Sequence, residues 1–425
     1  MKESFSTIDE VRNFLNRIPK FSTDGQSAAN FNLDRMRELC DSMGNPQDNF
    51  PSIHVAGTNG KGTVCRLLSS IYQNAGYKTA LYTSPHLERV EERFRVNTTE
   101  ISEKELIQFF QSYGDSLIAG GYTFFEITTA IAFWHFSAQN IDLAIIETGL
   151  GGRLDATNIL KPIATIITSV GIDHADILGN TLEAIATEKG GIIKQKTPVF
   201  IGKLKKAASD VIHQISKDAG SELIKINNDR FEYKNGTIHI VEGNNSIKMY
   251  SNSFKKIDAC NVQLCRNVVK YLETKYPVTR NEFSDGVEKM DKLYPKRAVF
   301  ERLSDHLNWY FDGAHNTEAT KHLINHVKQI APISSWNVVL SFMGDKLNNE
   351  IAKSWSGFDS IFVYEMPYSR AAKIEDMLNY FPNAKVVDEA NLINLTDLKS
   401  ELVIFSGSFY FYTVARTWLG TLNAS

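Results

Sequence analysis

The chain has 425 residues, more than one hydrophobic core usually holds, so two domains are expected. Hydrophobic residues make up 43% and charged residues 22%, a balance typical of soluble globular proteins. The formal net charge of −3 provides no broad basic surface, so nucleic acid is not an expected partner. Any anion binding must therefore come from local geometry.

The N-terminal stretch MKESFSTIDEVRNFLNRI mixes charged and apolar residues and lacks the apolar centre of a signal peptide. No apolar run is long enough to span a bilayer, so no membrane partner is expected. The cysteines show neither paired metal spacing nor a disulfide framework: Cys40, Cys65, Cys260 and Cys265. We interpret them as buried thiols of a protein in the reducing cytoplasm.

Short apolar segments alternate with helical patterns in the first part of the chain. SIHVAG (52–57) predicts a strand, and apolar residues then recur at helical spacing from Val64 to Ala75. TALYTS, IDLAIIETG and IATIITSVG predict further strands. Their nearly continuous apolarity is typical of a parallel sheet covered on both faces. The alternation predicts an α/β fold with a doubly wound, mostly parallel sheet.

The sequence becomes polar and hairpin-like from about Asn227 to Ser253, with a turn signal at 234–236. A helical stretch follows from about Ile257 to Met290. We interpret Tyr294-Pro295-Lys296 as a hinge.

Strand and helix patterns then resume after the hinge. LNWYFDG, SWNVVLSF, DSIFVYE and ELVIFSG predict the strands of a second, smaller, Rossmann-like α/β domain. The expected domains are therefore residues 1–296 and 297–425.

The glycine-rich segment GTNGKGT (57–63) follows a predicted strand and opens a predicted helix, as a phosphate-binding loop requires. Its spacing is unusual, because Val55 stands where the common P-loop has its first glycine. Glycines let the backbone approach phosphates, and amides at a helix start point at the anion. Lys61 would neutralise the β- and γ-phosphates, and Thr63 would place its hydroxyl on Mg²⁺. The alternative is a tight turn with a solvated lysine.

Polar residues stand just beyond the predicted strand ends: Ser84, Glu147, His174 and Asp312. In open α/β sheets this is the edge where ligands bind. Oxygen ligands suit Mg²⁺, whereas histidine is a less usual ligand for it. Taken alone, His174 would be a structural histidine, but its company with Ser84 and Glu147 favours a functional role.

Glu126 lies at the start of TFFEITTAIAFWHF (123–136), a helix that is apolar nearly all round and therefore expected to be buried. A buried carboxylate is costly unless it meets a cation or is neutralised. Two interpretations stay open. Either the helix dipole stabilises Glu126, or Glu126 is a ligand of a metal or of metal-bound water.

Together these segments resemble the folylpolyglutamate synthase/dihydrofolate synthase family, within the Mur ligase superfamily. The resemblance rests on HVAGTNGKGT, LYTSPHLERVEERFRVN, FFEITTAIAFWHF, ETGLGGRLDATN, GIDHADILGNTLEAIATEKGGIIK, FDGAHNTEA, FMGDKLN, YSRA and IFSGSFY. TSPHL and GLGGRLDATN favour the folate branch over the cell-wall Mur ligases. The resemblance implies a monomeric ligase that uses ATP to join L-glutamate to a folate or dihydropteroate carboxylate through an acyl phosphate.

The resemblance also implies roles for residues at the matching positions. ATP would be bound by Gly57, Thr58, Asn59, Gly60, Lys61, Gly62, Thr63, Arg297, Asp312, His315 and Asn316, with Asp312 and His315 facing it across a cleft. Thr63 and Glu126 would serve the nucleotide's Mg²⁺. A second Mg²⁺ would be held by Ser84, Glu147 and His174, and K⁺ is a further candidate ion.

Two more groups of roles follow from the same resemblance. The folate or pterin would be contacted by Thr83, Ser84, Pro85, His86 and Asp155. The catalytic residues would be Lys61, Glu147, His174 and Lys189. Lys189 corresponds to a lysine that is carbamylated in the superfamily, a modification that turns a cation into a metal-directed carboxylate.

Some segments depart from the family pattern. DACNVQLCRN (258–267) stands where Gly-x-x-Gln-x-x-Asn is usual, Lys296 replaces a glycine before Arg297, and Leu347 replaces an aspartate. EKGG stands where EKAG is more typical. These departures concern adenine contacts and domain closure rather than the phosphate and metal residues.

Three rival interpretations were weighed. A Mur-type ligase for a nucleotide-linked sugar peptide would need an N-terminal UDP-binding domain, for which the segment before the glycine loop is too short. A Mur-type amino-acid ligase that acts on another carboxylate belongs to the same class of alternatives. A P-loop switch or motor would leave FDGAHN unexplained. The third rival is a nucleotide-binding homologue that has lost catalysis.

Overall fold

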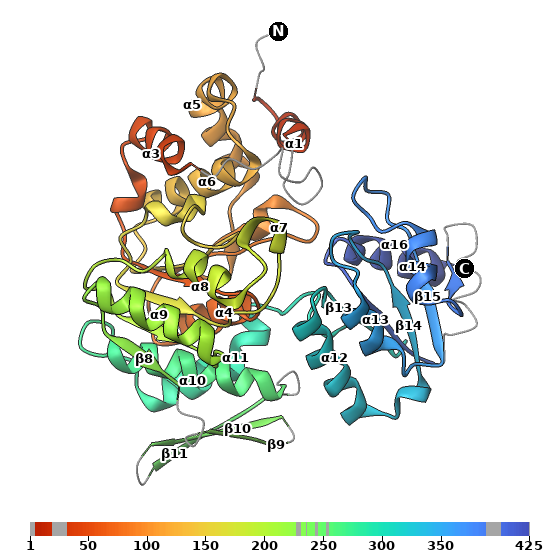
Figure 1. The fold of residues 1–425 in the computed structure, drawn as a ribbon. Coiled ribbons are helices and arrows are strands. Elements are labelled where there is room, and N and C mark those ends of the chain that lie inside the picture. The colour runs from red at the N-terminus through yellow and green to blue at the C-terminus, as the bar shows by residue number, and fades with distance from the viewer. Residues whose placement is uncertain are drawn as a thin grey trace. The chain divides into compact units, whose positions relative to one another are not determined.

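The computed structural model describes residues 5–18, 32–226, 231–234, 236–242, 245–251, 255–387 and 401–424. The chain divides into two compact units, Met1–Pro295 and Lys296–Ser425 (Figure 1). Asn235 of the predicted turn lies outside the described residues, as do 227–230, 243–244 and 252–253 of the predicted polar stretch. Among the described residues, none of the helices has the length and apolarity needed to cross a bilayer.

The first unit is built on an eight-stranded sheet with the strand order β4-β3-β2-β5-β1-β6-β7-β8. Six of these strands run parallel: β1 (Ser52–Ala56), β2 (Thr79–Tyr82), β5 (Leu143–Glu147), β6 (Ala164–Ile167), β7 (Val199–Ile201) and β8 (Leu223–Lys225). The strands β3 (Phe94–Val96) and β4 (Thr99–Glu100) add an antiparallel edge. The four strands predicted in this unit are confirmed, and they lie side by side at the centre.

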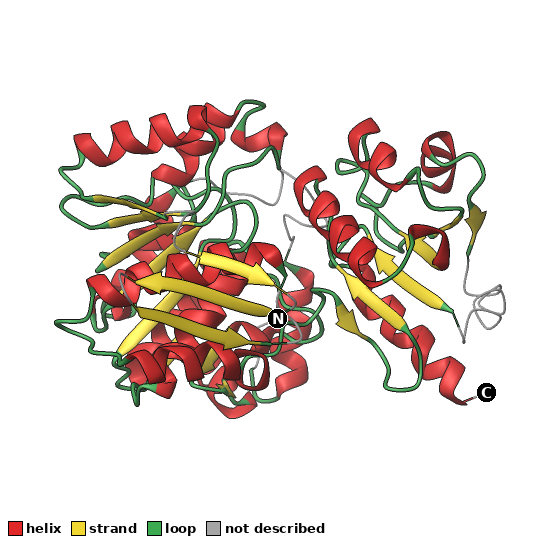
Figure 2. Cartoon of the chain, turned by 90° about the horizontal axis from the view of Figure 1, so that it is seen from below, coloured by secondary structure: helices red, strands yellow, loops and turns green. Residues whose placement is uncertain are grey.

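Side chains alternate between the two faces of this sheet. Ile53 and Val55 of β1 belong to one buried cluster, while Ala144 and Ile146 of β5 belong to another on the opposite face. Successive side chains of a strand point to opposite faces, so continuous apolar strands need helices on both sides. Figure 2 shows the red helices flanking the yellow strands. This is the doubly wound arrangement that the sequence predicts.

Helices from distant parts of the sequence cover the two faces. One face carries α4 (Lys61–Asn74), α10 (Lys256–Tyr271) and α11 (Arg280–Leu293). The other carries α1 (Ile8–Arg17), α3 (Leu33–Ser42), α5 (Glu103–Gly120) and α6 (Phe124–Ala138). The shorter α7 (Ala175–Leu178), α8 (Leu182–Gly190) and α9 (Lys206–Asp218) pack near β6 and β7, and η2 (Pro46–Asp48), η3 (Val90–Arg93) and η4 (Ala156–Ile159) are 3₁₀ turns.

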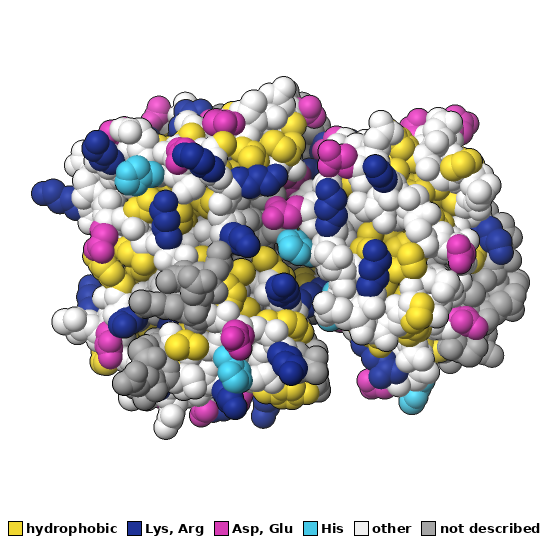
Figure 3. Space-filling model, turned by 60° about the horizontal axis from the view of Figure 1, so that its bottom comes forward, with side chains coloured by type: hydrophobic (Ala, Val, Ile, Leu, Met, Phe, Trp, Pro, Cys, Tyr) yellow, Lys and Arg dark blue, Asp and Glu magenta, His cyan; other side chains and the backbone are white. Residues whose placement is uncertain are grey.

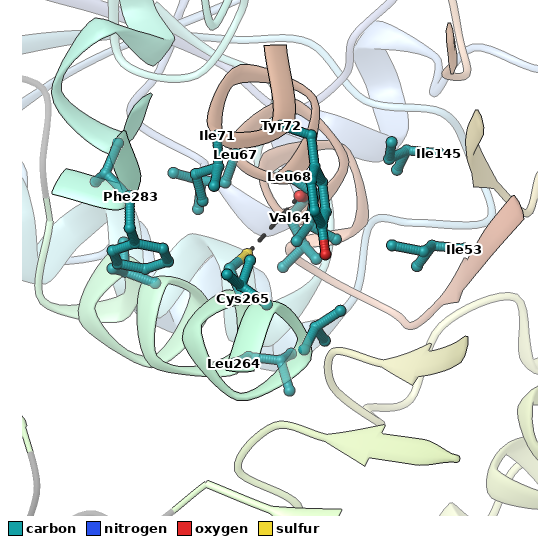
Figure 4. Close-up of a cluster of buried hydrophobic side chains, with 14 of the residues drawn as sticks. Ile53, Val64, Leu67, Leu68, Ile71, Tyr72, Ile145, Leu264, Cys265 and Phe283 are labelled. Carbon is teal, nitrogen blue, oxygen red and sulfur yellow. Dashed lines mark hydrogen bonds between the residues drawn. The ribbon is translucent and has the colours of Figure 1, made fainter. Parts of the chain in front are cut away.

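The predicted helical stretch 257–290 is two helices, because α10 ends at Tyr271 and α11 begins at Arg280. Pro277 lies in the connection, and a proline lacks the amide that a continuous helix needs at that point. Figure 4 shows α10 and α11 beside α4, with Cys265 close to Val64 and Phe283 on the side of Ile71. The Cys265 thiol donates to the Val64 carbonyl at 3.9 Å. The helix that carries the glycine loop is therefore fixed by residues 200 positions later.

The predicted polar hairpin is a small antiparallel sheet of three strands. Its order is β11-β10-β9, with bounds β9 (Phe231–Lys234), β10 (Thr237–Glu242) and β11 (Asn245–Tyr250). Ile238, Ile240 and Met249 are buried against the α10 and α11 side of the first unit.

The second unit has a six-stranded sheet with the order β12-β13-β17-β14-β15-β16. The strands β13 (Trp309–Asp312), β14 (Trp336–Leu340), β15 (Ser360–Val363), β16 (Lys385–Val386) and β17 (Leu402–Ser406) are parallel, and β12 (Glu301–Arg302) is antiparallel. Its helices are α12 (Thr317–Ile330), α13 (Asn349–Trp355), α14 (Ile374–Tyr380) and α16 (Phe411–Ala424), with the 3₁₀ turn η6 (Ile333–Ser335). All four strands predicted here are confirmed.

Candidate active site

The glycine loop joins β1 to α4, as the sequence predicts. At Gly57 the φ angle is 155°, and a Cβ would come within 1.9 Å of Thr168 Oγ1, so no larger residue fits there. Gly60 has φ 86°, in the left-handed region that favours glycine, and caps α4. Both glycines are therefore required by local geometry.

The loop is fixed by the segment that follows β6. The Thr58 amide donates to the Ser169 carbonyl at 3.0 Å, and the Asn59 amide donates to Ser169 Oγ at 2.9 Å. Thr168 Oγ1 donates to the Asn59 carbonyl at 2.7 Å. The Thr58 hydroxyl bonds both the carbonyl and the amide of Gly171. The loop is thus organised before any ligand arrives.

The start of α4 has no side-chain cap. The first amides of a helix have no partner inside the helix, so an uncapped start attracts an anion. Gly62 and Thr63 lie in this first turn. Lys61 Nζ donates to the carbonyl oxygens of Gly57, at 3.0 Å, and Thr58, at 3.5 Å. The ammonium group therefore lies over the loop, where a phosphate chain would bind.

Glu147 ends β5 and is buried, with its Oε2 accepting a hydrogen bond from the Ser84 amide at 3.3 Å. Burial raises the pKa of the Glu147 carboxyl, and the positive charges of Lys61 and Arg66 oppose this effect. The structure thus brings together Glu147 and Ser84, two of the three residues predicted for the second metal. Their oxygen atoms suit a hard divalent cation.

His174 immediately precedes α7, with a left-handed backbone, and its amide donates to Asp173 Oδ1 at 2.9 Å. The described residues contain no group of three or more His, Cys, Asp or Glu side chains arranged to hold a metal. The grouping of His174 with Ser84 and Glu147 therefore stays a prediction.

Lys189 lies in the last turn of α8 and is almost completely buried, with 3% exposure. Burial lowers the pKa of its amine to about 7, and the charge of Lys61 adds to this effect. The charges of Asp173 and Asp155 act in the opposite direction. A neutral amine is the form that reacts with carbon dioxide, so Lys189 is suited to carbamylation.

Asp155, predicted to contact the folate, organises its own loop. Its Oδ2 accepts hydrogen bonds from the Gly149 and Leu150 amides, both at 2.8 Å. Its Oδ1 accepts from the hydroxyl of Thr157, which also bonds His54 Nε2 at 2.8 Å. This buried chain connects β1 to the GLGGRLDATN segment. The described contacts therefore support a positioning role for Asp155.

The segment predicted to contact the pterin follows β2. Thr83 is buried, and its amide donates to the Arg93 carbonyl at 3.3 Å. The Ser84–Pro85 peptide bond is cis. His86 Nδ1 accepts a hydrogen bond from Arg93 Nε at 2.8 Å, and both side chains lie against Phe124. An aromatic ring beside a cation and an imidazole suits a flat heterocycle.

Glu126 forms a capping box at the start of α6. The Thr123 amide donates to Glu126 Oε2 at 2.7 Å, and the Glu126 amide donates to Thr123 Oγ1 at 3.2 Å. Arg35 Nε lies 3.5 Å from Glu126 Oε1. These contacts favour the helix-start interpretation of this buried carboxylate over the metal interpretation.

The four residues of the second unit that are predicted to bind ATP take part in local structure. Asp312 accepts hydrogen bonds from the amides of Phe300, at 2.9 Å, and Ala314, at 3.0 Å. His315 Nδ1 bonds the Gly313 carbonyl at 2.8 Å, and Asn316 caps α12. Arg297 donates to the Tyr412 hydroxyl at 3.3 Å.

Asn261 lies in the segment 258–267 that departs from the family pattern, and the sequence assigns it no nucleotide role. A Cβ on Gly60 would lie 3.2 Å from Asn261 Oδ1, so the amide of Asn261 lies against the glycine loop. The cause is the packing of α10 on α4, since Asn261 precedes Cys265 by one helical turn and Gly60 precedes Val64 by one turn. Asp258, three residues earlier, caps α10 through the Lys255 amide. No local pattern in the sequence places Asn261 beside Gly60, because the contact depends on the packing of α10 on α4.

The face drawn in Figure 3 shows no broad patch of basic side chains. On the face drawn in Figure 3, Lys and Arg side chains are interspersed with Asp and Glu. Anion binding is expected at the glycine loop because backbone amides and Lys61 converge there.

Comparison with known proteins follows the same division into two units. The family model of the Mur ligase middle domain matches residues 55–266, and that of the Mur ligase glutamate ligase domain matches residues 298–409. A dihydrofolate synthase/folylpolyglutamate synthase of Bacillus subtilis is 30% identical over 97% of this chain and 99% of its own length. The chain belongs to the folylpolyglutamate synthase/dihydrofolate synthase family. An Escherichia coli member is 31% identical over 85% of this chain and 84% of its own.

Solved structures of the family agree with this assignment. Escherichia coli FolC, solved in complex with ADP and without folate substrate, superposes with a TM-score of 0.85 at 25% identity and covers 100% of both chains. Folylpolyglutamate synthase from Thermotoga maritima gives a TM-score of 0.79 at 26% identity over 97% of each chain. The predicted α/β fold and family are confirmed. The P-loop switch or motor is therefore set aside.

Proposed function

We propose that this protein is an ATP-dependent ligase that joins L-glutamate to the carboxylate of dihydropteroate, of a folate, or of both. The observation that carries the proposal is the uncapped start of α4, with Lys61 over the loop and the buried Glu147 and Ser84 beside it. Relatives that match nearly the full length of the chain are named for this reaction. The Escherichia coli FolC structures contain ADP, and one also contains DHPP.

The reaction has two steps. A carboxylate oxygen of the substrate attacks the γ-phosphorus of ATP, the bond from that phosphorus to the bridging oxygen breaks, and ADP leaves with the electron pair. The amine of L-glutamate then attacks the carbonyl carbon of the acyl phosphate and loses a proton. Inorganic phosphate leaves, and an amide remains.

The glycine loop would position the phosphates for the first step. The amides of Gly62 and Thr63 face the anion from the helix start, and Lys61 offsets the charge that develops on the transferring phosphoryl group. Because Thr58 and Asn59 are already bonded to residues 168–171, the loop does not need to reorganise when ATP binds. Preorganised donors of this kind stabilise a transition state without reorganisation cost.

We propose that Ser84 and Glu147, with His174, hold one Mg²⁺, and that Thr63 provides a hydroxyl for the nucleotide's Mg²⁺. Mg²⁺ would supply charge neutralisation between phosphate and carboxylate oxygens. The buried Glu147 carboxylate fits this role, because a desolvated anion is stabilised by a cation. For Glu126 the capping box is the better supported role. A metal role is the alternative, and substitution of Glu126 in the product assay tests it.

We further propose that Lys189 is carbamylated. Carbamylation is expected to rise as the pH increases through about 7, the pKa of the amine, because only the deprotonated amine attacks carbon dioxide. ¹³C NMR of protein supplied with ¹³CO₂ should show a carbamate signal that Lys189→Ala removes. The control is the exposed Lys206, which should give no carbamate signal under the same conditions. An active, metal-loaded enzyme with an unmodified Lys189 would contradict this proposal.

The remaining assignments come from the resemblance. Thr83, Ser84, Pro85 and His86 are proposed to contact the pterin, with Asp155 fixing the neighbouring loop. Arg297, Asp312, His315 and Asn316 are proposed to take part in nucleotide binding. A monomer in the cytoplasm, with K⁺ as an activating ion, completes the proposal; the four cysteines are unpaired.

The test is a product assay by mass spectrometry. The enzyme receives ATP, Mg²⁺, K⁺ and L-glutamate, with dihydropteroate or tetrahydrofolate in separate reactions. One added glutamyl mass on dihydropteroate establishes dihydrofolate synthase activity, and the same on tetrahydrofolate establishes polyglutamylation. ATP binding is measured in parallel. Binding without any product would contradict the proposed ligase and favour the catalytically impaired homologue.

A further inference from the structure

One cation beside the glycine loop has no place in the mechanism above. Arg66 lies on α4, four residues after Gly62, so its side chain is on the same face of the helix. A Cβ on Gly62 would meet Arg66 Nη1 at 3.0 Å and Glu147 Oε2 at 3.5 Å. The guanidinium and the carboxylate thus converge on one small volume beside the first turn of α4.

Arg66 differs from the other cations of this region in its contacts. Lys61 bonds the loop carbonyls, Arg93 donates to His86, and Arg95 pairs with Glu100 at 2.7 Å. Within the described part of the chain, no hydrogen bond or ion pair engages the Arg66 guanidinium. The nearest carboxylate, that of Glu147, is held by the Ser84 amide instead.

Arg66 is also partly buried. Burial lowers the pKa of its guanidinium, and the charge of Glu147 opposes that effect. A guanidinium carries five N–H donors in a rigid planar fork. The arrangement is therefore suited to receiving an anion that the chain itself does not supply.

We propose that Arg66 binds the carboxylate of the pteroyl substrate and aligns it for attack on the γ-phosphorus of ATP. This inference rests on the proposed function. A carboxylate is the better match than a phosphate, because the phosphates are already served by the α4 amides and Lys61. The planar fork of an arginine binds both oxygens of a carboxylate at once. Arg66 stays protonated throughout and takes no part in bond breaking.

The test removes the charge on each side of the contact in turn. Arg66→Met keeps the length of the side chain and removes its charge, while Arg66→Lys keeps the charge and removes the fork. Dihydropteroate and its methyl ester are compared as ligands of the wild-type enzyme and both variants, with KM for dihydropteroate and for ATP measured in the product assay. Arg37→Met is the control, because Arg37 is exposed and pairs only with Asp34 in the described contacts.

In the wild type, esterification should weaken binding at least about tenfold, as expected for loss of a charge-assisted contact. In Arg66→Met the acid should bind as weakly as the ester, and KM for dihydropteroate should rise about tenfold with KM for ATP changed less than about twofold. Arg66→Lys should be intermediate, and Arg37→Met should match the wild type. Thermal unfolding of each variant shows whether the fold is kept, and Arg66→Lys carries the ester comparison if Arg66→Met does not fold.

Three results would overturn the inference. The ester could weaken binding equally in the wild type and in Arg66→Met, which would assign the carboxylate to another residue. KM for ATP could rise more than KM for dihydropteroate, which would assign Arg66 to the nucleotide. A wild-type enzyme without activity on any pteroyl substrate would contradict the proposed function, and this inference with it.

Discussion

The two units each contain a loop that joins a buried strand to a helix, but the two loops satisfy their helix starts differently. In the first unit Gly60 precedes α4 and provides no side-chain cap. In the second unit Asn316 caps α12 by accepting a hydrogen bond from the Ala319 amide at 2.9 Å. The amides at the start of α4 are left for an anion, whereas a side chain already serves the start of α12.

The surrounding polar groups follow the same difference. Around the first loop, hydrogen bonds fix the backbone from behind, through residues 168–171, and Lys61 lies over it. Around the second loop, the Asp312 carboxylate bonds the Phe300 and Ala314 amides. The difference teaches that two strand-loop-helix segments can satisfy their helix starts in different ways, since a side chain caps α12 whereas the start of α4 has no side-chain cap.

The largest effect is expected for Lys61→Ala. Removing this positioned charge should lower ATP-dependent turnover at least about a hundredfold, because it stabilises the transferring phosphoryl group. Steady-state kinetics with saturating glutamate measure the change. Kinetics like those of the wild type would remove the first loop's phosphate role and with it the contrast between the two loops.

Gly57→Ala should be next. The added Cβ would overlap Thr168 Oγ1, so the loop must shift and ATP affinity should fall about thirtyfold, roughly 2 kcal/mol. Calorimetric titration with ATP measures this. The control is Gly76→Ala, where φ is also positive, at 92°, but no atom lies within 4 Å of the new Cβ. If both variants lose affinity alike, a general loss of stability from backbone strain, and not the close approach at Gly57, accounts for the effect.

Asp312→Ala should affect stability. It removes the acceptor of two amides, so the free energy of unfolding of the second unit should fall by about 1.5 kcal/mol. Four of the five tryptophans lie in this unit, at Trp309, Trp336, Trp355 and Trp418, so fluorescence in urea reports its unfolding. The exposed Asp305 provides the control Asp305→Ala. Unchanged stability with a large loss of ATP affinity would show that Asp312 acts mainly on the ligand.

The smallest effect is expected for Asn316→Ala, about 1 kcal/mol, the usual contribution of a helix cap. The same urea experiment measures it. The matched control is Asn348→Ala, which removes the cap of the shorter α13 in the same unit. An Asn316 variant that keeps its stability would show that α12 does not depend on its cap, and the difference between the two helix starts would then be one of degree.

The sequence predicts well whatever depends on local pattern. Continuous apolar strands such as IDLAIIE and IATIITS lie at the centre of the sheet, and the glycine loop has the predicted strand-to-helix setting. The family follows from motifs that are themselves short. Pro277 is a local signal for the break between α10 and α11, and the prediction of one helical stretch over 257–290 did not take it into account.

What the sequence could not provide are contacts between distant segments. Asn261 meets Gly60 only because α10 packs on α4. Arg66 is a candidate binding residue only because it lies near Glu147, which is 81 positions away in the sequence. For Glu126 the sequence leaves helix start and metal ligand both open, and only tertiary packing places Arg35 beside its carboxylate. Side-chain partners of this kind depend on tertiary packing, which periodicity does not encode.

The packing of α10 and α11 on α4 also has a consequence for synthesis on the ribosome. The glycine loop and α4 are translated early, whereas the residues that cover the apolar side of α4, including Cys265 and Phe283 (Figure 4), emerge about two hundred residues later. Until then Val64, Leu68 and Tyr72 lack their final cover. The nascent chain therefore needs shielding over this interval, and a product that stops before Lys256 is expected to aggregate instead of forming a small nucleotide-binding domain.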